Sequence, residues 1–118
     1  MNTSGGFGQY IRVPADWVVK LPEGLSLKES MIIGTAGFTA GISVLRLSAL
    51  VKPSDGKILV SGATGGVGSV ALSLLSKLGY QTIAISGKET EYPFLRKLGA
   101  SDILPRAEFQ GVDKRPIL

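Results

Sequence analysis

A chain of 118 residues, 44% hydrophobic and 19% charged, is long enough for one domain with a buried core, and its composition is not that of a disordered protein. It contains no Cys and no His, which excludes disulfide bonds, thiol nucleophiles, Cys/His zinc sites and His general bases within this chain. The net charge of +4 comes from interleaved basic and acidic residues, without the basic cluster that is typical of nucleic-acid binding.

The N-terminal residues 1–9 are rich in glycine and polar residues and lack the basic and apolar segments of a signal peptide. The longest apolar region, residues 30–51, contains three glycines, several hydroxyl residues and Arg46. These interruptions argue against a membrane span. We therefore expect a cytoplasmic protein that binds neither a membrane nor a nucleic acid.

Two short β-prone runs, residues 10–13 and 17–21, are separated by a Pro-Ala-Asp turn and predict two strands. After a second turn at residues 22–24, Ser26 stands three residues before Glu29. This is the capping-box pattern, in which each side chain accepts a hydrogen bond from the other residue's backbone. It predicts a helix from about residue 27 to Leu50.

Three glycines, Gly34, Gly37 and Gly41, fall inside this predicted helix, where each costs up to about 1 kcal/mol relative to alanine. Their spacing of three and four places them on one stripe. One interpretation is close packing of the helix on a neighbouring element. A second, compatible interpretation is that Thr35, Thr39 or the backbone beside them lies against a flat ligand ring.

Residues 58–68 predict a strand, a tight glycine-rich turn and then a helix. The run Ile-Leu-Val at 58–60 is apolar, and the residues from Val67 to Leu78 have apolar positions spaced by three and four. Gly79 follows in the position of a left-handed helix cap. A turn of this kind points the free N–H groups of the helix, at the positive end of its dipole, toward an anion such as a nucleotide diphosphate.

The turn resembles the dinucleotide fingerprint G-x-G-x-x-G, with Ala63, Gly65 and Gly68 at the three glycine positions. Alanine is tolerated at the first position if the backbone there has a negative φ. Gly65 would let the backbone approach a phosphate, and Gly68 would let the helix pack closely on the strand. The alternative is a glycine-rich turn that binds nothing.

The rest of the chain continues the alternation of strands and helices. Residues 82–85 predict a strand, residues 91–98 a helix that ends at Gly99, and residues 102–105 a third strand. Strand, helix, strand, helix, strand is half of a doubly wound parallel sheet. The predicted fold class is therefore α/β, a partial Rossmann fold preceded by short N-terminal β-strands.

The end of the second strand is where such folds select their cofactor, and here it carries Ser86, Gly87 and Lys88. An NAD-specific site would have a carboxylate at this place, whereas a hydroxyl and an ammonium suit the 2′-phosphate of NADP(H). Glu89 follows directly and could reach a ribose, which keeps NAD open. Three further cations are interpreted as surface charges: Arg96, Lys97 and Arg106.

Four segments together resemble the zinc-independent quinone oxidoreductases of the medium-chain dehydrogenase/reductase superfamily, and within it the branch that includes acrylyl-CoA reductase. They are Ile-Gly-Thr-Ala-Gly-Phe-Thr-Ala at 33–40, Gly-Ala-Thr-Gly-Gly-Val-Gly at 62–68, Ser-Gly-Lys at 86–88 and Lys-Leu-Gly-Ala at 97–100. The resemblance covers about residues 5–109.

The resemblance implies that the chain looks like an excised piece of a longer, homo-oligomeric enzyme. Residues 1–24 would be the end of a GroES-like catalytic domain with linking strands, residues 25–109 the first half of the NADP-binding domain, and residues 110–118 a tail. Such an enzyme transfers hydride from NADPH to a small-molecule substrate, a quinone or an activated enoyl double bond, without zinc. The fragment alone is expected to bind NADPH weakly or not at all and to have no reductase activity.

The resemblance also implies roles for individual residues. The turn would hold the pyrophosphate, the segment 86–88 the 2′-phosphate, and Thr39 would lie near the nicotinamide. No catalytic residue is assigned within the chain. The residues of the turn that carry this expectation are Thr64, Gly65, Gly66, Val67 and Gly68.

Two alternatives use the same turn. A short-chain reductase would carry a Tyr-x-x-x-Lys pair, but the residues four positions after Tyr10, Tyr80 and Tyr92 are Pro, Ala and Arg. The other alternative, a non-catalytic NADP(H)-sensing module, remains open at this point.

Overall fold

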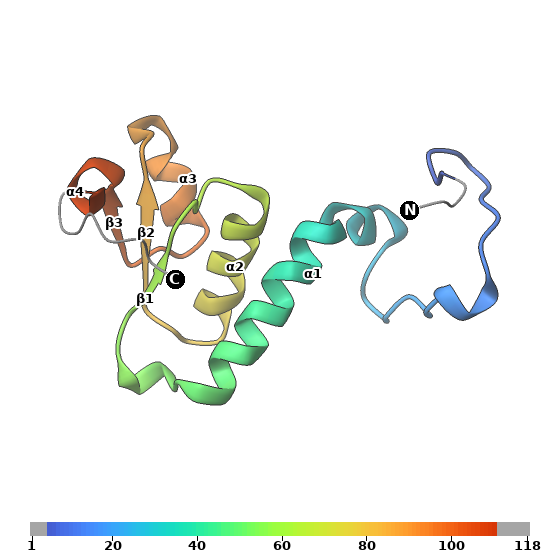
Figure 1. Cartoon of the computed structure of the whole chain (residues 1–118), viewed down its shortest axis with the longest axis horizontal. Helices are drawn as coiled ribbons and strands as arrows, with labels where there is room; N and C mark the ends of the chain where they lie inside the picture. The colour runs from blue at the N-terminus through green and yellow to red at the C-terminus, as the bar shows by residue number, and fades with distance from the viewer. Residues whose placement is uncertain (1–4, 111–118) are drawn as a thin grey trace. The chain divides into compact units, whose positions relative to one another are not determined.

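The computed structural model describes residues 5–110, which form two compact units that meet between Ile32 and Ile33 (Figure 1). The boundary falls inside one long helix, α1 (Leu27–Leu50). Each unit has its own local structure, built from the residues on its side of this boundary.

In the first unit, residues 5–26 contain one regular element, the short 3₁₀ helix η1 (Ala15–Trp17). The predicted strands at 10–13 and 17–21 are therefore wrong. A strand needs a neighbour to receive its backbone hydrogen bonds, and no other segment among residues 5–32 pairs with these runs. The side chains of Tyr10, Trp17 and Val19 are correspondingly exposed.

The N-terminus of α1 has the predicted capping box. The Ser26 backbone N–H donates to Glu29 Oε2 at 2.8 Å, and the Glu29 N–H donates to Ser26 Oγ at 3.1 Å. The helix then breaks at Gly34, whose φ of 48° and ψ of −156° are accessible essentially only to glycine. By length and hydropathy alone α1 would suffice to cross a membrane. Within it Ala40 and Val44 are buried, and 17% of its apolar stretch is buried in all.

Their common stripe on the predicted helix suggested one packing role for the three glycines of α1. In the structure each of them has a different environment. Gly34 is required by its backbone conformation. At Gly37 an added methyl group would lie 2.2 Å from the Ile33 side chain. This glycine therefore makes room for a side chain of the same helix, not for a neighbouring element. An added methyl at Gly41 would meet open space.

The second unit contains a three-stranded parallel sheet in the order β1-β2-β3, formed by β1 (Ile58–Val60), β2 (Thr82–Ser86) and β3 (Asp102–Pro105). Leu59 pairs with Ile83, and Ser86 pairs with Pro105. The connections are η2 (Pro53–Asp55), α2 (Gly66–Lys77), η3 (Glu89–Glu91) and α3 (Tyr92–Lys97), and α4 (Arg106–Gln110) follows the last strand (Figure 1). This arrangement confirms the predicted α/β half of a doubly wound sheet.

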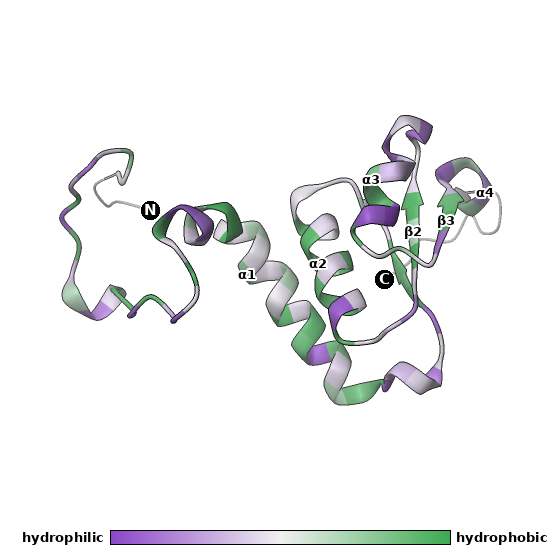
Figure 2. Cartoon of the chain, turned by 180° about the vertical axis from the view of Figure 1, so that it is seen from behind, coloured by the Kyte–Doolittle hydropathy of each residue, from purple (hydrophilic) through white to green (hydrophobic). Residues whose placement is uncertain are grey.

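The core of this unit lies between the sheet and its helices. Its centre is formed by Leu72 and Leu75 of α2, Ala84 of β2, Leu95 of α3 and Val44 of α1, all buried. Figure 2 shows the strands as predominantly hydrophobic, as expected for a parallel sheet covered by helices. The predicted left-handed cap at Gly79 is confirmed by its φ of 87°, and Gly99, where the second helix was expected to end, also has a positive φ, of 106°.

Candidate functional site

The glycine turn lies at the carboxyl end of β1 and is closed by its own backbone. Gly62 has a φ of 58°, and the Gly65 N–H donates to the Gly62 carbonyl at 2.9 Å. Ala63, at the first fingerprint position, is fully buried and does not have a positive φ. The positive φ therefore falls one residue before the position that the alignment had marked, which explains why alanine fits there.

The close contact between helix and strand occurs at Gly68. A methyl group there would lie 2.2 Å from the Gly62 carbonyl oxygen and 2.8 Å from its carbon, both of them backbone atoms. Any other side chain would push α2 away from the turn. A methyl group at Gly66 would lie 3.2 Å from the Ala36 side chain, so α1 also approaches the start of α2 closely.

The first turn of α2 leaves three backbone amides without an acceptor in the described part of the chain. The first hydrogen bond of the helix runs from the Ser69 N–H to the Gly65 carbonyl at 2.9 Å, and the N-cap, Gly65, offers no side-chain cap. The amides of Gly66, Val67 and Gly68 are therefore free at the positive end of the helix dipole. The Gly65 amide is not free, because it closes the turn.

A groove of about 600 Å³ lies beside this turn, between α1, β1 and α2. Its walls are mainly apolar, with Val44, Leu59 and Ala71 among them, and the glycine turn forms one end. Ser43 lines the groove. Thr39 does not: it is exposed one turn earlier on α1, and its Oγ1 donates to the Thr35 carbonyl at 2.9 Å.

At the carboxyl end of β2 the segment 86–88 is ordered by a side chain. The Lys88 N–H donates to Ser86 Oγ at 3.1 Å, and Ser86 itself is only 2% exposed. Gly87 and Lys88 are exposed. The parallel sheet brings this segment to the same edge as the glycine turn, because the carboxyl ends of parallel strands lie together.

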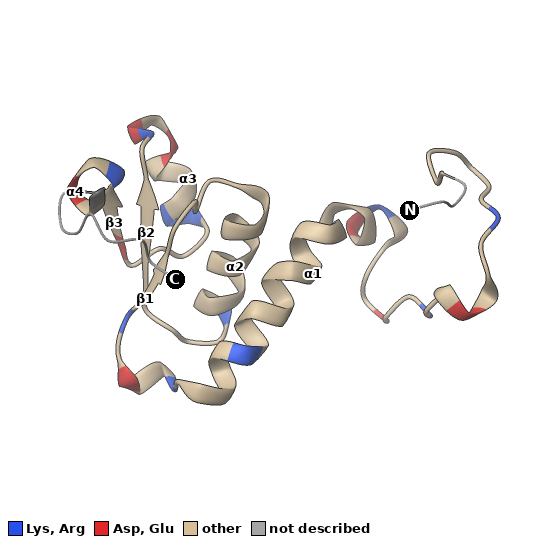
Figure 3. Cartoon of the chain, in the orientation of Figure 1, with Lys and Arg blue, Asp and Glu red and all other residues tan. Residues whose placement is uncertain are grey.

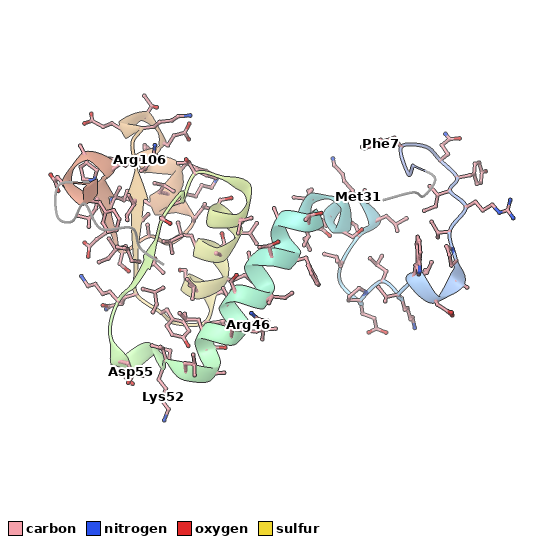
Figure 4. The ribbon with its side chains drawn as sticks, in the orientation of Figure 1. Phe7, Met31, Arg46, Lys52, Asp55 and Arg106 are labelled. Atoms are coloured by element: carbon pink, nitrogen blue, oxygen red, sulfur yellow. The ribbon has the colours of Figure 1, made fainter. Side chains whose placement is uncertain are left out.

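Arg106, which the sequence analysis interprets as a surface charge, lies beside the segment 86–88. It follows Pro105, the partner of Ser86 in the sheet, and its guanidinium lies over Gly87: an added methyl there would be 3.6 Å from Arg106 Cζ and 3.7 Å from Nη1 (Figure 4). The predicted alternation of strands and helices could have indicated this position, because in a parallel sheet a residue directly after β3 lies beside the end of the neighbouring strand β2. Arg96, by contrast, donates to the Ser101 carbonyl at 3.5 Å.

The charges of the unit are unevenly distributed. Figure 3 shows α2 free of charge up to Lys77, while basic and acidic residues occur beyond the end of β2 and at the start of α4. At the opposite edge, the Lys57 ammonium bonds to the Asp102 carboxylate at 2.5 Å and lowers the pKa of Asp102 below its ordinary value.

Among residues 5–110, no group of three or more Asp, Glu, Cys or His could hold a metal ion.

Several known proteins are similar to this chain, although no family model matches it. It is 52% identical over 117 residues to a probable acrylyl-CoA reductase, AcuI, of Escherichia coli. It is 48% identical over 109 residues to a putative quinone oxidoreductase, YhfP, of Bacillus subtilis. The alignments cover 98% and 92% of this chain but 36% and 33% of the relatives, so the chain spans about one third of their length.

This chain is a homologue of the quinone oxidoreductases and acrylyl-CoA reductases. They are members of the medium-chain dehydrogenase/reductase superfamily, which confirms the resemblance stated above.

Solved structures of such reductases have the same fold over most of the chain. The yhdH oxidoreductase from Salmonella enterica in complex with NADP superimposes with a TM-score of 0.85 at 51% identity, covering 97% of this chain and 35% of that one. The E. coli YHDH with bound NADPH gives 0.80 at 54% identity, over 91% and 33%. The yhfP protein of B. subtilis, solved with NAD bound, gives 0.78 at 50% identity, over 81% and 30%. These likenesses confirm the Rossmann-like fold.

Proposed function

We propose that this chain is the NADP(H)-binding portion of a cytoplasmic, zinc-independent reductase that transfers hydride to a quinone or to an activated, acrylyl-CoA-like double bond. The observation that carries the proposal is the set of free amides at Gly66, Val67 and Gly68, at the carboxyl edge of the sheet. Backbone N–H groups at a helix N-terminus bind a pyrophosphate both by hydrogen bonding and through the helix dipole. The homologous structures solved with NADP or NADPH support the choice of ligand.

We assign the 2′-phosphate to the neighbouring strand ends. Lys88 follows β2, Arg106 follows β3, and the guanidinium of Arg106 lies over Gly87. Two cations at the ends of adjacent strands suit a phosphate dianion, and a guanidinium presents paired donors to its oxygens. Glu89 and Glu91 lie close by in η3, and their carboxylates would favour a ribose with free hydroxyls, as in NAD.

The remaining roles follow from the placement of the groove. The bound cofactor would supply a hydride, and this chain would hold and orient the dinucleotide. The groove beside the turn would receive its nicotinamide end, with Ser43 on the wall and the predicted contact, Thr39, one turn away. The proposal leaves the small-molecule substrate to the part of the homologous enzymes that this chain does not span.

A titration of the ¹⁵N-labelled chain with NADPH and with NADH tests the proposal. Both should shift the amides of Gly66, Val67 and Gly68, and NADPH alone should shift that of Gly87 strongly. Arg106→Ala should weaken NADPH binding about tenfold and NADH binding less than about twofold, because a charge-assisted contact to phosphate is lost. Arg46→Ala, which removes an exposed arginine of α1, is the matched control. Binding that shifts other amides but not those of residues 66–68 would refute the proposal.

A further inference from the structure

Ser86 is unusual among the polar residues of the proposed 2′-phosphate site because its side chain faces inward. Its hydroxyl oxygen accepts the Lys88 N–H at 3.1 Å and donates toward the Lys88 carbonyl at 3.5 Å. With 2% of the residue exposed, it presents almost no surface to a ligand. A short side chain that bonds to the backbone two residues later shapes a turn.

Lys88 is held from a second direction as well. Its carbonyl accepts the Glu91 N–H at 3.1 Å, which begins η3. Both backbone polar groups of Lys88 therefore have partners, one from the strand before it and one from the helix after it. The side chain of Lys88 is exposed, but the backbone that carries it is already ordered in the absence of a ligand.

From this geometry we infer that Ser86 is a positioning residue for cofactor selection: it acts through Lys88 and does not itself contact the 2′-phosphate. The inference rests on the proposed function, since it concerns the same site. A cation on an ordered backbone loses less conformational entropy on binding than one on a mobile loop. Without the Ser86 hydroxyl, Lys88 would still be present, but its backbone would no longer be fixed next to Gly87, the residue that the Arg106 guanidinium lies over.

The test compares two probes on the 118-residue chain, adenosine 2′,5′-bisphosphate and 5′-AMP, which differ only in the 2′-phosphate. Ser86→Ala should weaken binding of the bisphosphate about fivefold and leave that of 5′-AMP within about twofold, so their affinity ratio falls. In a Lys88→Ala background the same substitution should change the ratio by less than about twofold, because the two residues act as one unit. A general loss of stability would not move this ratio.

Ser101→Ala is the matched control. Its hydroxyl also accepts a backbone N–H, that of Thr82 at 3.3 Å, but at the opposite edge of the sheet, so the affinity ratio should not change. In the ligand-free chain, Ser86→Ala should also speed hydrogen exchange at the Lys88 amide by about tenfold or more, since the acceptor that this N–H has within residues 5–110 is lost.

Two results would overturn the inference. One is an equal effect of Ser86→Ala with and without Lys88, which would indicate direct contact with the phosphate. The other is unchanged exchange at the Lys88 amide in the Ser86→Ala chain. If the unsubstituted chain binds both probes equally, the preference for NADP(H) in the proposed function fails instead, and that result is read from the unsubstituted chain alone.

Discussion

At the scale of single residues, one carbonyl, that of Gly62, decides the geometry of the glycine turn. It accepts the Gly65 N–H and lies directly against Gly68. The position of the free amides of α2 therefore depends on how closely the helix approaches this carbonyl. Such an approach is possible only because residue 68 has no side chain.

Gly68→Ala should destabilise the chain by about 1–3 kcal/mol, because backbone atoms cannot move aside as a flexible side chain would. Gly41→Ala is the control: there an added methyl meets open space, and replacing a helical glycine should stabilise by about 0.5–1 kcal/mol. Urea unfolding followed by circular dichroism measures both changes. Equal stabilities of the Gly68→Ala and unsubstituted chains would contradict the contact.

Asp102 gives a prediction for pH. The hydrogen bond from Lys57 and, after it, the Coulombic attraction of that ammonium hold the pKa of Asp102 below its ordinary 3.8. Because the folded value is the lower one, the stabilising contribution is present above about 3.8 and is lost as pH falls through the folded pKa. Lys57→Gln should raise the pKa of Asp102 toward 3.8 in a carbon-detected NMR titration, while Lys52→Gln should leave it unchanged. An unaltered titration in Lys57→Gln would show that the pair does not form in solution.

At the scale of elements, the end of α1 is tied to the start of β2 by one side chain. Tyr80 is buried, and its hydroxyl donates to the Val51 carbonyl at 2.6 Å. This bond joins residues 29 positions apart and holds α1 beside the α2–β2 connection. The position of α1 matters for the site because α1 forms one wall of the groove.

Tyr80→Phe should reduce the free energy of unfolding by about 0.5–1.5 kcal/mol, the net value of one such hydrogen bond. Tyr92→Phe is the matched control, because in the described structure the hydroxyl of Tyr92 makes no hydrogen bond and should be dispensable. Denaturant unfolding of the two variants provides the measurement. A similar loss in both would indicate that the Tyr80 hydroxyl does not tie the elements.

At the scale of the whole molecule, the sheet of the second unit ends at β1, where Leu59 is 45% exposed beside the apolar groove. An open edge of this kind offers unpaired backbone groups and apolar surface. The homologous reductases are about three times as long as this chain, and a dinucleotide normally lies across both halves of such a sheet.

The isolated chain should therefore bind NADPH weakly and should not reduce a quinone or an enoyl thioester. Oxidation of NADPH, followed by its absorbance, provides the measurement, with the full-length E. coli relative as the positive control. Turnover by the 118-residue chain at a rate near that of the control would show that this chain alone holds a complete active site.

The sequence by itself determined the parts of the protein that depend on local chemistry. The capping box at Ser26, the left-handed cap at Gly79, and the order of strands and helices from residue 58 to 105 were all predicted, because short-range periodicity and glycine conformation dictate them. The β-prone runs before residue 22 failed because propensity forms no strand without a partner.

Only the tertiary structure decided which groups are free to act. Spacing could not reveal that Gly65 uses its amide to close the turn, that the Ser86 hydroxyl faces the Lys88 backbone, or that Arg106 lies over Gly87. Each of these depends on an atom supplied from elsewhere in the turn or by a neighbouring strand. The contact of Arg106 arises from the packing of parallel strand ends at one edge of the sheet, and the other two arise from the backbone conformation that each turn adopts in the folded chain.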